Sequence, residues 1–188
     1  MNKVILCFCC ALFLMGNASA EENNLLTNPS FEIDKDANGI PDGWEFDVKA
    51  WTGSKGEINW KKGSGRSGDY SVNISITNDV GSMGVRSLII PVKPNTTYRV
   101  SGWLKSEFSE WKKERSAYFS LNGYKDGKFV KENGYTNAVQ LSSEWKEYAV
   151  EFSTGTSFDG LTISANLFGS GSIWIDDFSC VEKVEAKP

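Results

Sequence analysis

The most constraining feature of this sequence is an alternation of apolar and polar side chains along several short segments. Between residues 160 and 168, apolar side chains occupy every second position, at Leu161, Ile163, Ala165 and Leu167. A period of two places successive side chains on opposite faces of a β-strand. The same alternation occurs in residues 70–76, 98–105, 116–124 and 145–152, and residues typical of turns separate these segments. The sequence therefore predicts an all-β sandwich or barrel.

The first twenty residues have the features of an export signal. Lys3 gives a basic start, residues 4–15 form an apolar run, and residues 18–20 are small. The apolar run is too short to span a bilayer, and we expect no membrane span elsewhere. We therefore expect cleavage after Ala20 and a secreted or periplasmic protein. Residues 21–182 are then expected to form one domain, and residues 183–188 a disordered tail.

The composition excludes several kinds of active site and partner. The chain has no histidine, which excludes Ser-His-Asp and Cys-His triads and the usual histidine-bearing zinc sites. Three of its four cysteines lie in the export signal, so only Cys180 would remain and no internal disulfide is expected. The formal net charge of −4 argues against a nucleic-acid partner. We expect a monomer that is not an enzyme.

Two adjacent carboxylates, Asp176 and Asp177, lie in an otherwise apolar segment near the C-terminus. Buried carboxylates are costly unless they are paired or bound to a metal. Glu32 follows Phe31 near the other end of the mature chain and is also an acid beside an aromatic residue. If the first and last strands meet in one sandwich, these three acids are expected to share a hard cation such as Ca²⁺. The alternative interpretation is that the two aspartates end a strand at the surface.

A second candidate metal site is the acidic segment between residues 34 and 45. Its oxygen-bearing side chains follow the spacing of a calcium-binding loop, with Gly39 at the turn, and they are Asp34, Asp36, Asn38, Asp42 and Glu45. The helices that flank such a loop in an EF-hand are missing from the predicted pattern. The segment is therefore either a lone calcium loop or a polar turn rich in Asp, Asn and Gly.

Several of the predicted strands have an apolar face and an opposite face of aromatic, amide and hydroxyl side chains. An aromatic ring can stack on the C–H face of a sugar, while amides and guanidinium groups bond its hydroxyls. On this basis the candidate ligand-binding residues are Arg99, Trp103, Tyr118, Asn122, Tyr124 and Asn166. The alternative is a second packing face, with Trp103 covered by a loop.

Six short motifs together resemble one known group of proteins. They are NPSFE (28–32), PDGW (41–44), GRSGDYS (65–71), PNTTY (94–98), WKEY (145–148) with Phe152, and IDDF (175–178). In this order they make residues 25–182 similar to the secreted carbohydrate-binding modules of the family 4/9 (CenC-type) group, with family 22 close by.

This resemblance implies both a fold and a metal. The implied fold is a galactose-binding-like jelly-roll β-sandwich of two antiparallel sheets. The implied metal is a structural Ca²⁺ held by Glu32, by Asp176 or Asp177, and by backbone carbonyls near residues 66–71.

The resemblance also implies carbohydrate recognition, because such modules bind polysaccharide chains in a cleft on one sheet. They are normally attached to a glycoside hydrolase, whereas here we expect the module without an accompanying catalytic domain. We therefore expect an exported, non-catalytic protein that binds a polysaccharide or oligosaccharide. One alternative is a small jelly-roll glycosidase or polysaccharide lyase that uses paired acids, or Tyr and Arg. Another is a structural or adhesive surface protein that binds another protein.

Overall fold

The computed structural model describes residues 23–48, 53–107, 116–135 and 141–183, with side chains described outside residues 131–135. This part of the chain contains strands and no helix. The strands are β1 (Trp44–Asp47), β2 (Gly56–Lys62), β3 (Tyr70–Ile76), β4 (Ser82–Ser87), β5 (Ile90–Pro91), β6 (Thr97–Ser106), β7 (Ser116–Lys125), β8 (Lys128–Tyr135), β9 (Lys146–Ser153), β10 (Gly160–Phe168) and β11 (Gly171–Glu182). Consequently, no helix in the described ranges is long and apolar enough to cross a membrane.

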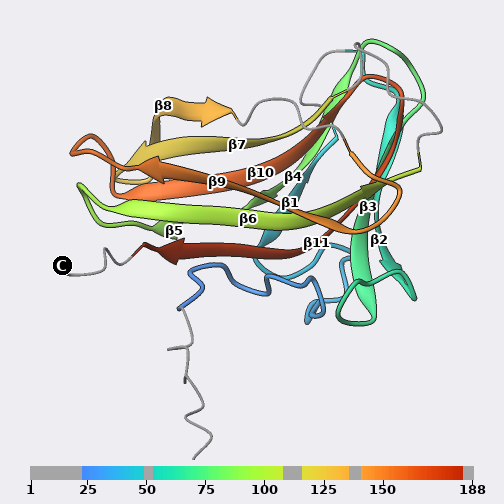
Figure 1. Cartoon of the computed structure of the whole chain (residues 1–188), viewed down its shortest axis with the longest axis horizontal. Coiled ribbons are helices and arrows are strands. Elements are labelled where there is room, and N and C mark those ends of the chain that lie inside the picture. The colour runs from blue at the N-terminus through green and yellow to red at the C-terminus, as the bar shows by residue number, and fades with distance from the viewer. Residues whose placement is uncertain (1–22, 49–52, 108–115, 136–140, 184–188) are drawn as a thin grey trace, which may run out of the picture.

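The strands form two antiparallel sheets that pack face to face (Figure 1). Sheet A has the order β1-β4-β10-β7-β8, and β5 also pairs with β10. Sheet B has the order β2-β3-β11-β6-β9. The last two strands therefore lie inside different sheets, β10 between β4 and β7 and β11 between β3 and β6. This arrangement is a jelly-roll β-sandwich, and it confirms the fold predicted from the sequence.

The alternation in the sequence correctly separates the core face of each sheet from its outer face. In β10, Leu161, Ile163 and Leu167 are completely buried between the sheets. Each such side chain contributes about 1.5–3 kcal/mol relative to an exposed one. Leu104 of β6 and Ile173 of β11 enter the same core from sheet B. The core therefore fixes which side chains of each strand point outward.

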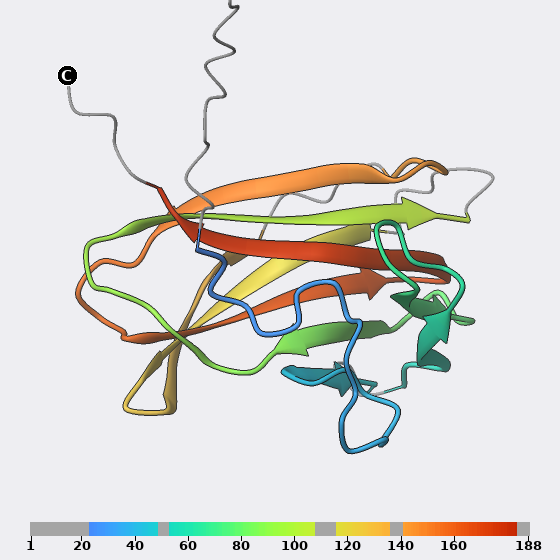
Figure 2. The ribbon, with the colours of Figure 1, turned by 90° about the horizontal axis from the view of Figure 1, so that it is seen from below.

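The segment before β1 is irregular, and Leu25 and Leu26 do not form a strand. It runs irregularly beside β11 (Figure 2), where Leu25 N–H donates to Cys180 O (2.9 Å) and Phe178 N–H donates to Pro29 O (2.9 Å). A regular ladder is excluded because Pro29 has no N–H and Asn28 and Phe31 have positive φ angles.

This irregular segment is nevertheless anchored by aromatic packing. Phe31 is fully buried, 4.7 Å from Trp44 and 6.2 Å from Phe178 between ring centroids. The packing places Glu32, the next residue, near Asp176 in the middle of β11.

The predicted export signal and the predicted C-terminal tail lie mostly outside the described residues. The export signal lies entirely outside the described residues, and so does the predicted tail after Lys183. Lys183 itself is ordered, since its N–H donates to Thr97 O (2.8 Å) and its side chain pairs with Glu151.

Candidate functional site

Four of the six predicted ligand-binding residues lie together on the outer face of sheet A. Tyr118, Asn122 and Tyr124 are on β7, and Asn166 on β10 is directly opposite Tyr118. Their strand neighbours of the other parity, such as Leu121, are buried in the core. The four side chains therefore point away from the core, and we call this surface the polar face of sheet A.

The middle of the polar face is built from small or flat-lying polar side chains. Asn166 donates from Nδ2 to Ser120 Oγ (3.1 Å), which keeps the amide against the sheet. Gly84 of β4 is directly opposite Asn166 of β10, and a Cβ at this position would come within 2.3 Å of Asn166 Oδ1. Gly84 therefore belongs to this face, although no sequence pattern singled it out.

Arg99 and Trp103 do not share this face, so the expectation that all six residues form one surface is wrong. Both are on β6 in sheet B, and both point outward because Val100 and Leu104 are buried. The Arg66 guanidinium lies 3.5 Å from the Trp103 ring centroid, and Arg99 pairs with Glu147 (2.9 Å). Alternation predicts the face of a strand and does not predict which sheet the strand joins.

One end of the polar face opens into a cavity of about 320 Å³. Its described lining residues are Glu45, Arg86, Ser87, Leu88, Ile89, Tyr124 and Thr162. Leu88 and Ile89 form an exposed apolar rim. The Thr162 hydroxyl is buried and has no hydrogen-bond partner among the described residues. The cavity therefore combines an aromatic ring, an apolar rim and a few polar groups, as small-molecule sites commonly do.

Glu45 and Arg86 form the charged part of this cavity. They face each other across β1 and β4, and Arg86 donates to Glu45 Oε2 from Nη2 (2.7 Å) and Nε (3.2 Å). The hydrogen bond to Glu45 raises the pKa of Arg86 further above its usual value. Glu45 was predicted as the last ligand of the acidic loop, and this pairing assigns its carboxylate to another partner. The signal that the sequence lacked is the pairing of β1 with β4.

The first acid cluster lies where the segment before β1 meets β11. Asp176 is 0% exposed and accepts N–H bonds from Arg66 (2.6 Å) and Asp177 (2.7 Å). Glu32 accepts N–H bonds from Tyr70 (3.0 Å) and Asp69 (3.1 Å). Backbone from residues 66–70 thus surrounds both carboxylates, so the fold has brought distant acids together.

The two adjacent aspartates have different environments. Asp177 binds the Arg66 guanidinium (2.6 Å) and the Ser67 hydroxyl (2.6 Å), and it is partly exposed. Asp176 has no cationic partner in the described part of the chain. Burial raises the pKa of Asp176 to about 6, and the nearby charges of Asp177 and Glu32 act in the same direction. Of the two, Asp176 therefore carries the negative charge that the protein itself does not compensate.

Glu32 and Asp176 offer the kind of ligand atoms that a hard cation takes, but among the described residues the group of three acids whose ligand atoms lie within 4.8 Å of one another is Asp34, Asp36 and Asp42. Carboxylate and carbonyl oxygens are the ligands that Ca²⁺ prefers, and a bound cation removes the cost of burying Asp176. The Glu32 carboxylate lies very close to the backbone of Gly68, since a Cβ on Gly68 would lie 2.2 Å from Glu32 Oε1. The glycine therefore allows the Glu32 carboxylate to approach the backbone of this loop.

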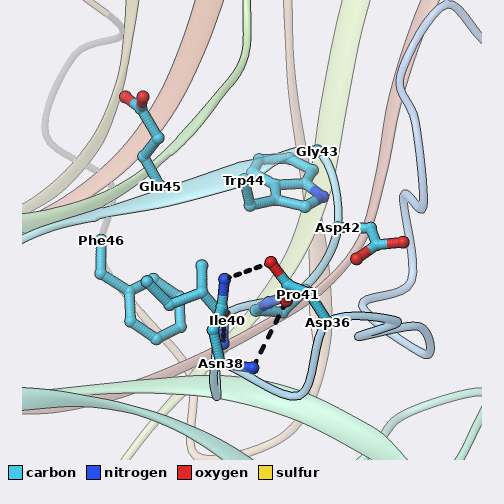
Figure 3. Close-up of a pocket in the computed structure, with 9 residues that line it drawn as sticks. All are labelled: Asp36, Asn38, Ile40, Pro41, Asp42, Gly43, Trp44, Glu45 and Phe46. Carbon is cyan, nitrogen blue, oxygen red and sulfur yellow. Dashed lines mark hydrogen bonds between the residues drawn. The ribbon is translucent and has the colours of Figure 1, made fainter.

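The second acid cluster is an open surface loop (Figure 3). Asp34, Asp36 and Asp42 each place a carboxylate oxygen within 4.8 Å of the others. Asn38 donates to both oxygens of Asp36, and its own side-chain oxygen accepts the Ile40 N–H (2.7 Å). Figure 3 also shows the Glu45 side chain directed away from this loop.

Much of the charge in this loop is satisfied locally. Desolvation, which would raise the pKa of Asp34, is outweighed by hydrogen bonds from Gly39 and Asn38, so the pKa is lowered. Asp42 accepts the Lys35 N–H (3.1 Å) and lies 3.9 Å from the Lys35 ammonium. The loop can therefore hold its shape through its own polar contacts, as the alternative interpretation proposed.

A two-sheet jelly roll with an open polar sheet face and an acid pocket beside its last strand defines a ligand-binding β-sandwich module. The carbohydrate binding domain family, CBM_4_9, matches residues 23–169, and the chain belongs to this family. The resemblance noted in the sequence is thereby confirmed. No curated protein matches the sequence.

Solved structures with the same fold include sugar-binding modules and one phage protein. The CBM22-1 xylan-binding domain from Paenibacillus barcinonensis Xyn10C has 16% identity and a TM-score of 0.59, with 88% of this chain and 97% of that chain covered. TmCBM61, solved in complex with β-1,4-galactotriose, has 20% identity and a TM-score of 0.54, with 85% and 99% covered.

The phage protein is the enzymatically active domain of bacteriophage CBA120 tailspike protein 4. It has 12% identity and a TM-score of 0.63 over 85% of this chain. The present chain spans only 21% of the tailspike chain. At these identities the likenesses show a shared fold.

Proposed function

We propose that this protein is an exported, non-catalytic module that binds a polysaccharide or oligosaccharide on the polar face of sheet A. The observation that carries the proposal is the cavity at the end of that face, where Tyr124, Arg86 and Glu45 surround an open space. Family membership supports a sugar as the ligand, and the cavity supports the polar face of sheet A as its proposed site.

The cavity has the groups that a sugar ring requires. The Tyr124 ring offers apolar area for a C–H face, and the Arg86–Glu45 pair offers a donor and an acceptor for neighbouring hydroxyls. Because the pair is internally neutralised, it favours a neutral sugar unit over a charged one. Asn122 and Asn166 extend the row of amides along the face, so a chain of several sugars could lie across β7 and β10.

The same cavity gives little support for an enzyme. Glycoside hydrolysis uses two carboxyl groups that flank the bond. Among the described lining residues the cavity has one carboxylate, Glu45, and it is paired with Arg86. The solved structures of carbohydrate-binding modules with this fold support the same interpretation.

We further propose a structural Ca²⁺ held by Glu32, Asp176 and backbone carbonyls of the neighbouring loop. The ion would supply positive charge to a buried carboxylate and join the segment before β1 to β11. It would stabilise the native state by binding only there, with no role in chemistry.

A glycan-array screen of residues 21–188, followed by titration calorimetry on the best ligand, tests the sugar site. Tyr124→Ala is expected to weaken binding at least about tenfold, because a stacking ring is lost. Glu45→Gln is expected to weaken it by a similar factor, because one acceptor is lost and Arg86 loses its partner. Arg99→Gln, on sheet B, serves as the control and is expected to bind normally.

The outcomes separate the competing functions. Unchanged binding by folded Tyr124→Ala and Glu45→Gln would place the sugar elsewhere. An empty array with a folded protein would favour a protein-binding surface role. Release of reducing ends or unsaturated products from a polysaccharide would favour the glycosidase or lyase alternative.

A further inference from the structure

The outer face of sheet B carries two lysines packed against two indole rings. Lys61 Nζ lies 5.1 Å from the Trp174 ring centroid, and Lys105 Nζ lies 5.5 Å from the same ring. Lys105 Nζ also lies 4.8 Å from the Trp145 ring centroid. We call Lys61, Trp174, Lys105 and Trp145 the Lys–Trp row. It contacts none of the residues that line the sheet A cavity, and it lies on the other side of the sandwich.

The row is built across the strands of a rigid sheet. Lys105 of β6 is directly opposite Trp174 of β11, and Lys61 lies on β2, with β3 between β2 and β11. Trp145 immediately precedes β9, the neighbour of β6. Figure 2 shows β9, β6 and β11 side by side in one layer (orange, yellow-green and red). The row therefore crosses the strands, and its spacing is fixed by the sheet.

Outward orientation follows from strand parity. Ile173 and Ile175, on either side of Trp174, are fully buried, and so is Leu104, next to Lys105. The Trp174 indole N–H donates to Glu107 Oε1 (2.9 Å), which holds the plane of the ring. The two ammonium groups are thus positioned by ring contacts and presented to solvent.

The two lysines of the row belong to the minority of described basic side chains that have no carboxylate partner in the described ranges. Most described lysine and arginine side chains form an ion pair with a carboxylate. Lys61 and Lys105 form no such pair with any carboxylate in the described ranges. Each cation–π contact contributes about 0.5–1 kcal/mol at an exposed site and reduces the freedom of the lysine. Two oriented positive charges therefore lack a direct ion-pair partner in the described ranges, on a chain whose net charge is −4.

We propose that the Lys–Trp row is a second binding site, specific for an acidic polysaccharide that carries uronate groups. Carboxylates of the polysaccharide pair with Lys61 and Lys105. The C–H groups of its sugars pack on the accessible edges of the two indoles. The amide of Asn59, on the same outer face of β2 as Lys61, is available for hydroxyls.

Charge density favours this ligand over other anions. A nucleic acid or an anionic membrane presents closely spaced negative charges over a wide area, and the net acidic chain is repelled by such surfaces. Glu107, and Glu147 on β9, add negative charge close to the row. A uronate chain has at most one charge per sugar, separated by neutral hydroxyls, so it can meet the two lysines without approaching these acids closely.

The test is affinity electrophoresis of the whole chain in gels containing polygalacturonate, alginate or neutral xylan, with calorimetry on any polymer that retards it. All gels contain the same calcium concentration, and each polymer is first dialysed against the same calcium-containing buffer. The test variants are Lys61→Gln, Lys105→Gln and the double variant. Lys55→Gln and Lys128→Gln are matched controls, because these exposed lysines also lack a carboxylate partner in the described ranges and lie outside the row.

The expected result is retardation by at least one uronate polymer, weakened about tenfold or more in the double variant and unchanged in both controls. The salt dependence of binding should also decrease in the double variant, because fewer counterions are released. Tyr124→Ala should retain uronate binding, so failure of the sheet A site and failure of this site are distinguishable.

Three outcomes would overturn the proposal. The first is no retardation of the wild-type chain by either uronate polymer. The second is binding of these polymers by the double variant as strong as that of the controls. The third is binding to vesicles that contain phosphatidylglycerol and not to uronate polymers, which would assign the lysines to a lipid surface.

Discussion

Asp176 and Asp36 belong to the two acidic clusters that the sequence offers as candidate calcium sites. Asp176 is completely buried next to Glu32, whereas Asp36 is exposed in a loop that is braced by its own hydrogen bonds. The two clusters have similar ligand atoms and differ in desolvation. Buried negative charge creates a need for a cation, while exposed negative charge is stabilised by water. This difference predicts that calcium stabilises the fold through the buried cluster.

The largest expected effect is that of Asp176→Asn, measured as melting temperature with calcium and with EDTA. With calcium, the variant should be clearly less stable than the wild type, because a charged ligand is lost. With EDTA, the variant should be as stable as the wild type or more stable, because the variant no longer buries an uncompensated charge. A pKa raised from 3.8 to about 6 corresponds to about 3 kcal/mol at neutral pH, as an upper value.

The same comparison has a defined pH dependence in EDTA. The pKa of Asp176 is higher in the folded state, so its contribution to stability is complete at low pH, where the carboxyl is protonated in both states. That contribution is lost as the pH rises through about 6, and the wild type should lose stability relative to Asp176→Asn over this range. Equal stability losses for Asp176→Asn with calcium and with EDTA would contradict a calcium site at this residue.

An intermediate effect is expected for Gly68→Ala. A Cβ at this position would lie 2.2 Å from Glu32 Oε1, so the Glu32 carboxylate must move away from the pocket. We expect a loss of about 1–3 kcal/mol in calcium, typical of overpacking at a constrained site. Calcium titration followed by tryptophan fluorescence should show weaker binding than in the wild type. Wild-type calcium affinity in the folded variant would exclude Glu32 as a ligand.

The smallest effect is expected for Asp36→Asn in the exposed loop. Its stability should stay within about 0.5 kcal/mol of the wild type with calcium and with EDTA, as for most surface substitutions. Chemical denaturation in both buffers measures the stability. Glu45→Gln is measured in the same way as a second variant of this segment, because Glu45 pairs with Arg86. A calcium-dependent loss for Asp36→Asn as large as that for Asp176→Asn would remove the contrast between the clusters.

The sequence was informative wherever a local rule applied. Strand parity correctly placed Leu161 in the core and Tyr118 on an outer face, because a period of two needs only the chain itself. Parity treated Trp103 and Tyr118 alike, yet they lie on different sheets. The loop pattern likewise placed Glu45 with Asp34, whereas the pairing of β1 with β4 directs Glu45 to Arg86.

The sequence by itself determined the all-β character, the in-or-out orientation of each strand residue and, through its ordered motifs, the family. Only the tertiary structure decided which outward residues share a surface. It separated Trp103 from Tyr124, enclosed Asp176 beside Glu32, and aligned Lys61, Trp174 and Lys105 across the sheet. These proximities depend on pairing between strands far apart in the chain, and such pairing is set by the packing of the whole core.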